Sequence, residues 1–161
     1  MYDEGVNTCA TLREWETLAL AAVSNPLGQQ TSDTFIDVLI ASTYTNNPFA
    51  RSYLAWRSMM LDEEVQGPRD TRSALVVQNF VNEKCHGRRF FVTDKGYLGI
   101  GPAGMRLKQQ VAVLLGGRVP FVLENIEGDK CRLVGECYLH GSMKGKAVQG
   151  SGDRMDTFRI L

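Results

Sequence analysis

Three residues that can carry or move protons lie close together in the C-terminal half of the chain: Glu136, Tyr138 and His140. They alternate with other residues in a run typical of a β-strand, so their side chains are predicted to share one face. Each two-residue step spans about 6.6 Å, which places Glu136 and His140 about 13 Å apart on a flat strand. Such a row can transfer protons on a bound small molecule. Alternation alone also produces polar strand faces, so an exposed or helix-covered face is the alternative.

Other residues predicted for this site come from elsewhere in the chain. Asp94 is a further candidate acid–base group, and Arg89 and Tyr97 are candidate substrate-binding residues in the same half. Tyr53 and Trp56 share one face of a predicted helix and could line a ligand cavity. Aromatic side chains dominate ordinary cores, so we favour a core role for those of the helical half. They are Trp15, Phe35, Tyr53, Trp56 and Phe80.

Nucleophilic and metal chemistry find little support in the residue spacing. Cys137 is predicted on the opposite strand face from His140, which argues against a Cys–His pair. Two cysteines and two histidines could supply zinc ligands, but the ligand-pair spacing of zinc sites is missing. They are Cys85, His86, Cys137 and His140. The sequence therefore predicts free thiols and no bound metal.

Residues 99–104 match the dinucleotide-binding pattern GxGxxG, and Glu124 follows at about the distance of a ribose-binding acid. That pattern must open a helix, yet only Met105 to Gln110 separate it from a predicted strand at Val111. We therefore interpret this stretch as strand–turn–strand and predict no cofactor.

The elements that must position these residues divide the chain in two. Five short β-type runs separated by glycine-bearing turns follow residue 87, which is typical of a small antiparallel barrel or a bent sheet. They are 88–93, 96–102, 111–117, 119–123 and 132–141. Residues 1–87 show helical periodicity and predict about four helices packed on those strands. The fold class is therefore α+β.

Local signals predict where the helices begin and end. Thr11 begins a capping box with Glu14, and Thr31 or Ser32 can cap the next helix. Asn47-Pro48 predicts a third start, with proline at the first helical position. Asp70 can cap a fourth helix that ends before Gly87. That last helix leads directly into the β-rich half.

Length and charge bound the organisation of the chain. At 161 residues it is predicted to form one domain: a helical part at 1–87, a barrel-like part at 88–148 and a C-terminal extension at 149–161. Residues 1–85 carry a net charge of −5 and residues 86–161 a net charge of +5. The basic residues are scattered among turns, which does not favour nucleic-acid binding.

The sequence also bears on location. The acidic N-terminus, without a following apolar run, is not a secretory signal, and no stretch reaches the length of a membrane span. Four cysteines without CxxC spacing favour a reducing compartment. We expect a cytoplasmic protein without membrane contact.

Several short stretches of the β-rich half also carry a family resemblance. They are Arg88–Thr93, Gly96–Gly99 with Gly101-Pro102, Val113–Gly117 with Pro120–Leu123, and Leu133–Gly141. In this order and spacing they resemble the C-terminal region of fungal heterokaryon-incompatibility (HET) proteins, over Arg88 to Val148. The resemblance implies a fungal, intracellular protein. Full-length relatives carry an N-terminal HET domain that drives cell death on non-self recognition, and we expect no such domain in this chain.

The chain departs from the family pattern at three places. Lys108-Gln109 stands where relatives usually have Gly-Asp, and Glu124 where they usually have Arg. Met143–Lys146 replaces an acidic segment. These changed charges suggest a surface whose ligand or partner has changed.

Two functions follow from these observations. The first is a stand-alone binding or regulatory module that recognises a protein or a small ligand. The alternative is a small cofactor-free enzyme of fungal secondary metabolism, such as a cyclase, isomerase or dehydratase. It would use the acid–base residues in a pocket between helices and barrel. The oligomeric state is not predicted.

Overall fold

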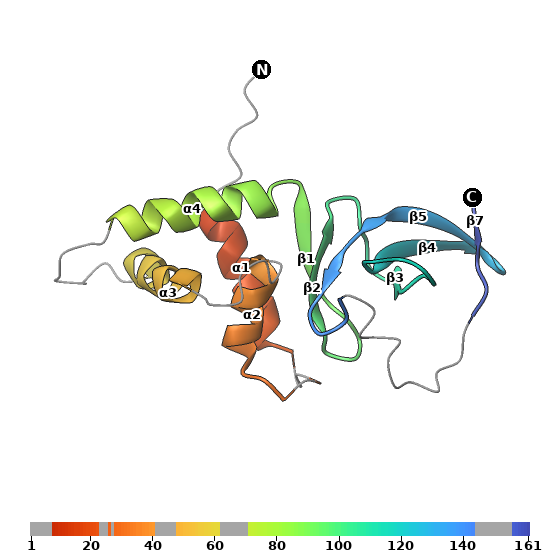
Figure 1. The fold of residues 1–161 in the computed structure, drawn as a ribbon, viewed down its shortest axis with the longest axis horizontal. Helices are drawn as coiled ribbons and strands as arrows, with labels where there is room; N and C mark the ends of the chain where they lie inside the picture. The colour runs from red at the N-terminus through yellow and green to blue at the C-terminus, as the bar shows by residue number, and fades with distance from the viewer. Residues whose placement is uncertain (1–7, 23–25, 27, 41–47, 62–70, 144–155) are drawn as a thin grey trace, which may run out of the picture.

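Helices and strands occupy separate halves of the chain and separate ends of the molecule (Figure 1). A computed structural model describes residues 8–22, 26, 28–40, 48–61, 71–143 and 156–161. Its helices are α1 (Thr8–Leu20), α2 (Thr31–Leu39), α3 (Pro48–Leu61) and α4 (Thr71–Cys85). Its strands are β1 (Arg88–Val92), β2 (Leu98–Pro102), β3 (Gln110–Ala112), β4 (Phe121–Glu127), β5 (Lys130–Glu136), β6 (Tyr138–Leu139) and β7 (Arg159–Ile160).

The first two helices begin differently from the prediction. Because α1 starts at Thr8, Thr11 lies inside the helix and the predicted capping box is wrong. The residue that precedes α2 is Gln30, and its side chain makes no capping hydrogen bond. Neither Thr31 nor Ser32 is therefore the cap. The free amides at the start of α2 therefore receive no capping hydrogen bond from the side chain of Gln30.

The predicted start of α3 and the predicted end of α4 agree with the structure. The third helix begins at Pro48, as predicted. The predicted caps Asn47 and Asp70 lie outside the described residues. Gly87 follows α4 with φ +65°, the left-handed conformation expected of a residue that ends a helix.

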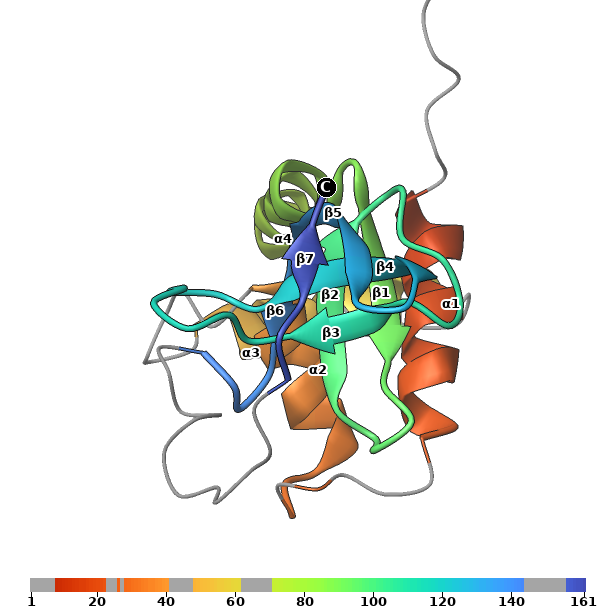
Figure 2. The ribbon, with the colours of Figure 1, turned by 90° about the vertical axis from the view of Figure 1, so that its right-hand side faces the viewer.

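The described strands form two sheets. Sheet A has the order β1-β2-β6 and sheet B the order β3-β4-β5-β7. All pairs are antiparallel except β5 with β7. The α+β prediction is confirmed, and the described strands form two bent sheets instead of a closed barrel (Figure 2).

Sheet A lies between the helices and sheet B, and alternate side chains leave its two faces (Figure 1). Phe90, Leu98 and Ile100 join the helix–sheet core, in which apolar residues of all four helices are also buried. Phe91 and Leu139 point the other way, into an inter-sheet core with Val122. One sheet therefore supplies side chains to both cores.

Aromatic rings fill the contact between the helices and sheet A. Phe90 of β1 meets Phe35 edge-on at 5.4 Å and stacks on Trp15 at 6.0 Å, between ring centroids. Phe35 also meets Tyr53 at 6.2 Å, and Tyr53 meets Trp56 at 5.7 Å. The favoured interpretation of these aromatics as core residues is confirmed.

Two glycines of the GxGxxG stretch, Gly99 and Gly101, serve packing. Gly99 pairs with Phe91 across β1 and β2, so the aromatic ring covers the glycine. A Cβ at Gly99 would overlap the ring of Phe91 and lie 2.6 Å from the main-chain oxygen of Tyr138. A turn follows β2, whereas a nucleotide-binding motif would need a helix at this place. The interpretation as strand–turn–strand is confirmed.

The last predicted strand is in fact two strands. β5 ends at Glu136, and the amide of Cys137 donates a hydrogen bond to Pro120 O at 2.9 Å, before β6 begins in the other sheet. Within β5 the register shifts, because Val122 pairs with Gly135 and Leu123 with Leu133. The residue left over is Val134.

At this bulge Val134 turns toward the inter-sheet core and packs against it, whereas the neighbouring Leu133 is 43% exposed. The crossing of the chain from sheet B to sheet A at Cys137 interrupts the predicted single row of Glu136, Tyr138 and His140.

Gly99→Ala should lower the free energy of unfolding by about 1–3 kcal/mol, because a methyl group has no room there. Gly104→Ala is the matched control, since a Cβ at Gly104 meets nothing within 4 Å. Urea denaturation of both variants gives the comparison. Equal stability of the two variants would show that the close packing of Phe91 on Gly99 is not required.

Candidate functional site

Tyr138 and His140 form the centre of the candidate site. Both side chains are buried, each 7% exposed, and Tyr138 belongs to the helix–sheet core. The Tyr138 hydroxyl lies 3.1 Å from His140 Nδ1, and His140 Nε2 lies 2.8 Å from Gln29 Oε1. The amide of His140 also donates to Leu98 O at 3.0 Å. A hydrogen-bond chain thus joins the end of sheet A to the segment before α2.

The chemistry of the partners assigns the proton positions. The Gln29 oxygen can only accept, so His140 Nε2 carries a proton and donates it. In the neutral ring, Nδ1 then accepts from the Tyr138 hydroxyl. Both ring nitrogens are therefore engaged by side chains of the protein. Gln29 itself is exposed, so the chain of hydrogen bonds begins at the surface and ends in the core.

Asp37 on α2 is a neighbour that the sequence did not point to. Burial raises the pKa of its carboxyl from the ordinary value of 3.8, the charge of His140 opposes this, and Asp33 adds to it. Two side chains therefore lie near His140: Gln29 before α2 and Asp37 on α2. More than a hundred residues separate them from His140 in the sequence, and no local pattern links them.

Glu136 does not join this group. It ends β5 in sheet B, pairs with Phe121 and is exposed. Its main-chain oxygen accepts a hydrogen bond from Arg88 Nη1 at 3.2 Å. The two predicted acid–base neighbours of Glu136 lie in and after β6, in the other sheet.

The remaining candidates of the β-rich half take part in local structure. Asp94 is exposed in the turn between β1 and β2. Tyr97 closes that hairpin: its amide donates to Thr93 Oγ1 at 3.0 Å, and its oxygen accepts from the Thr93 amide at 2.9 Å. Arg89 Nη1 donates to Met105 O at 2.9 Å. Each has a role in a turn or connection.

Tyr53 and Trp56 lie on α3 in the helix–sheet core, at 2% and 3% exposure. The indole N–H of Trp56 has no hydrogen-bond partner among the described residues. Burial raises the pKa of Tyr53, and the Glu16 carboxylate adds to the shift. Both side chains therefore behave as core residues.

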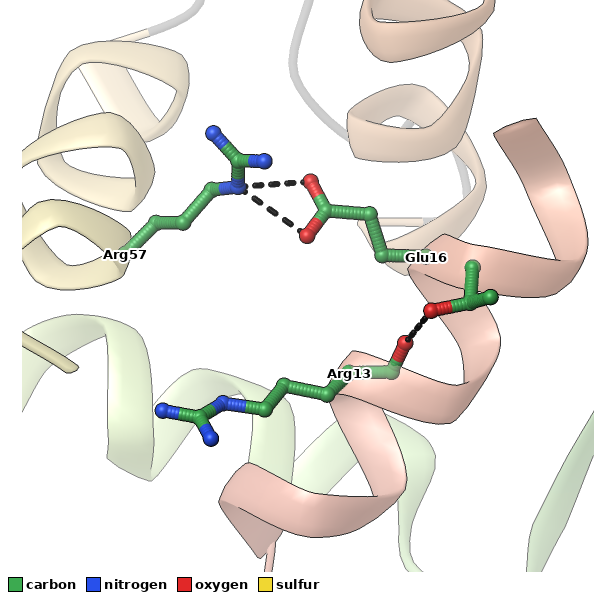
Figure 3. A network of polar contacts seen from close by, with 4 residues as sticks. Arg13, Glu16 and Arg57 are labelled. Carbon is green, nitrogen blue, oxygen red and sulfur yellow. Dashed lines mark hydrogen bonds and ion pairs between the residues drawn. The ribbon is translucent and has the colours of Figure 1, made fainter. Parts of the chain in front are cut away.

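An ion pair ties α3 to α1 beside Tyr53 (Figure 3). Arg57 Nε lies 2.7 Å and 3.0 Å from the two carboxylate oxygens of Glu16, and the Glu16 side chain is 18% exposed. In the same view, the main-chain oxygen of Arg13 accepts from Thr17 Oγ1 at 2.8 Å. The partly buried ion pair of Arg57 and Glu16 fixes α3 against α1.

The thiols of Cys85 and Cys137 are protonated at neutral pH. Burial raises the pKa of Cys137 and of Cys85 to about 12, and Arg88 opposes both shifts. The described cysteines, with Cys131, are free. Cys137 also packs in the inter-sheet core, away from the helix-facing side of Tyr138. It is therefore not an activated nucleophile.

Metal sites and membrane spans are absent from the part of the chain that the structure describes. No group of three or more His, Cys, Asp or Glu side chains among these residues could hold a metal ion. None of the described helices combines the length and apolar character needed to cross a membrane.

The fold and its buried polar chain define a small α+β protein with two bent sheets. The family described as the Het-6 beta-barrel domain matches residues 70–160, more than half of the chain. The chain belongs to this family. The match includes the whole of α4 and all of the described strands.

A named relative agrees with this assignment. The chain is similar to heterokaryon incompatibility protein 6, OR allele, of Neurospora crassa, with 31% identity over 77 residues. The match covers 46% of this chain and 11% of the relative. No solved structure is significantly similar to the chain. The predicted resemblance to heterokaryon-incompatibility proteins is confirmed.

Asp37→Asn tests the electrostatics beside His140. A raised pKa means that the folded chain holds this proton more tightly than the unfolded chain. The stabilisation is present below pH 3.8 and is lost as pH rises through the raised pKa. As the pH rises from about 4 to 7, the free energy of unfolding of Asp37→Asn should therefore increase relative to that of the wild type. Urea denaturation at each pH measures this, and a difference that does not change with pH would contradict it.

Proposed function

We propose that this protein is a binding or regulatory module of the heterokaryon-incompatibility type, which acts by contact with a partner. One observation carries the proposal: His140, the strongest candidate for catalysis, is used inside the fold. It is 7% exposed, and both ring nitrogens have side-chain partners. A general base must come within hydrogen-bond reach of the proton that it takes from a substrate.

The distribution of the other candidates supports the same conclusion. Glu136 and Asp94 are exposed, but neither contacts Tyr138 or His140 in a described hydrogen bond. Acid–base catalysis needs its groups around one bound molecule. Exposed charges spread over separate turns suit contact with a partner better than chemistry at one point.

The Asp37 carboxyl favours a second candidate, a cofactor-free acid–base enzyme of secondary metabolism such as a cyclase, isomerase or dehydratase. Its raised pKa and its electrostatic coupling to His140 are features that occur at catalytic sites. Gln29 is exposed, so its movement would open His140 Nε2 to a small molecule. In this alternative His140 and Asp37 would exchange protons with the substrate, and Tyr138 would orient the imidazole.

Two further properties complete the proposal. We infer a cytoplasmic location, supported by the free thiols at Cys85, Cys131 and Cys137. The partner is a protein or a small ligand. The scattered basic residues of the β-rich half do not favour nucleic acid.

A pair of variants in a fungal host separates the two functions. His140→Ala should destabilise the fold by about 2–4 kcal/mol, because it leaves Tyr138 and Gln29 without their shared partner. Its protein level should fall, while Glu136→Gln, at an exposed position, should leave the level unchanged. At matched protein levels both variants should give the metabolite profile of the wild type. A metabolite that disappears with either variant at normal protein level would establish the enzyme instead.

A further inference from the structure

The connection between β2 and β3 carries an unusual exposed side chain. Leu107 is 95% exposed, the highest value among the large apolar side chains that the structure describes. Arg106 and Lys108 flank it and are exposed as well. We refer to Arg106–Gln109 as the tip.

The tip is an ordered turn. The amide of Arg106 donates to Gln109 Oε1 at 2.7 Å, and the amide of Gln109 donates to Arg106 O at 3.4 Å. These two hydrogen bonds close the four residues around Leu107 and Lys108. The backbone that carries Leu107 is therefore fixed and loses little freedom on binding, which favours affinity.

The base of the tip is anchored in the fold. Met105 is 8% exposed and packs in the inter-sheet core. Its main-chain oxygen accepts from Arg89 Nη1 at 2.9 Å, and its amide donates to Pro102 O at 3.0 Å. Leu107 therefore stands two residues beyond a fixed point of the structure.

Lys108 occupies a backbone conformation that suits glycine. Its φ is +69°, and it is the one non-glycine residue with positive φ among the described residues. An L-residue at this turn position is strained, and glycine would relieve the strain. A cation kept at such a position points to a use for its charge.

We propose that the tip is the surface through which this protein binds a partner protein, with Leu107 in an apolar pocket that carboxylates surround. The inference rests on the proposed binding function and names its contact. Arg106 and Lys108 place two positive charges beside Leu107, and neither forms an ion pair with a described residue. The complementary surface is therefore apolar at its centre and acidic at its rim.

An anionic membrane offers similar chemistry but fits less well. Stable attachment to a bilayer takes two anchoring signals, and the tip provides one apolar side chain. A protein pocket can enclose that side chain completely and pair both cations. We therefore argue for a protein, and membrane binding is an outcome of the test.

The first part of the test is photo-crosslinking in a fungal host. A diazirine amino acid replaces Leu107 in the full chain, and a second chain carries it at Leu115. Leu115 is 78% exposed on the connection between β3 and β4 and serves as the matched control. The expected result is a protein adduct from position 107 that position 115 does not give, attached within an acidic segment. A lipid adduct, the same adduct from both positions, or no adduct at position 107 would overturn the proposal.

The second part uses the protein identified in this way, purified. Leu107→Ser should weaken its binding roughly tenfold or more, and Leu115→Ser should leave it unchanged. Lys108→Gly should weaken binding and reduce its salt dependence while raising Tm, because it removes a charge and relieves strain. Binding unaffected by Leu107→Ser would overturn the role of the tip but leave a binding module. A full chain that binds neither a protein nor a small ligand would overturn the proposed function as well.

Discussion

The structure depends on the burial of both faces of sheet A. A sheet in this position must direct alternate side chains into two different cores, and the strands of sheet A do so. Phe90 packs among the helices, and the next residue, Phe91, packs toward sheet B. Glycine at residue 99 lets the ring of Phe91 lie against β2. Removing that room would disturb both cores, because the same strand serves both.

Burial on both faces also decides what a polar residue of this sheet can do. Tyr138 and His140 lie at the edge that meets the helices, where an unpaired polar group would be costly. They satisfy each other and reach the surface through Gln29. The same low exposure keeps the Cys137 thiol protonated. Side chains that could do chemistry by their type, such as Tyr138, His140 and Cys137, are therefore part of the packing of the fold.

The sequence predicted the classes of element well and their details less well. Glycine-bearing turns correctly divided the β-rich half, and periodicity correctly indicated the helices. The extra residue Val134 could not be predicted, because a bulge depends on pairing with a distant strand. The crossing between the sheets at Cys137, which separates Glu136 from Tyr138, could not be predicted either. The α1 start was also missed, since helix ends depend on packing as much as on capping residues.

The site was predicted only in part for a similar reason. Tyr138 and His140 were found from their own spacing, but Gln29 and Asp37 meet His140 only through the packing of α2 on sheet A. The resemblance to HET proteins did contain one structural hint. Relatives usually have glycine at the place of Lys108, and φ of +69° there is the conformation that glycine favours.

If sheet A belongs to both cores, the helices and sheet B cannot unfold separately. Both tryptophans of the chain, Trp15 and Trp56, lie in helices, so their fluorescence reports on the helical half. Hydrogen exchange of β4 and β5, followed by mass spectrometry through the same urea series, reports on sheet B. We predict one transition with one midpoint from both signals. A helical half that melts at lower urea while β4 and β5 stay protected would contradict a shared central sheet.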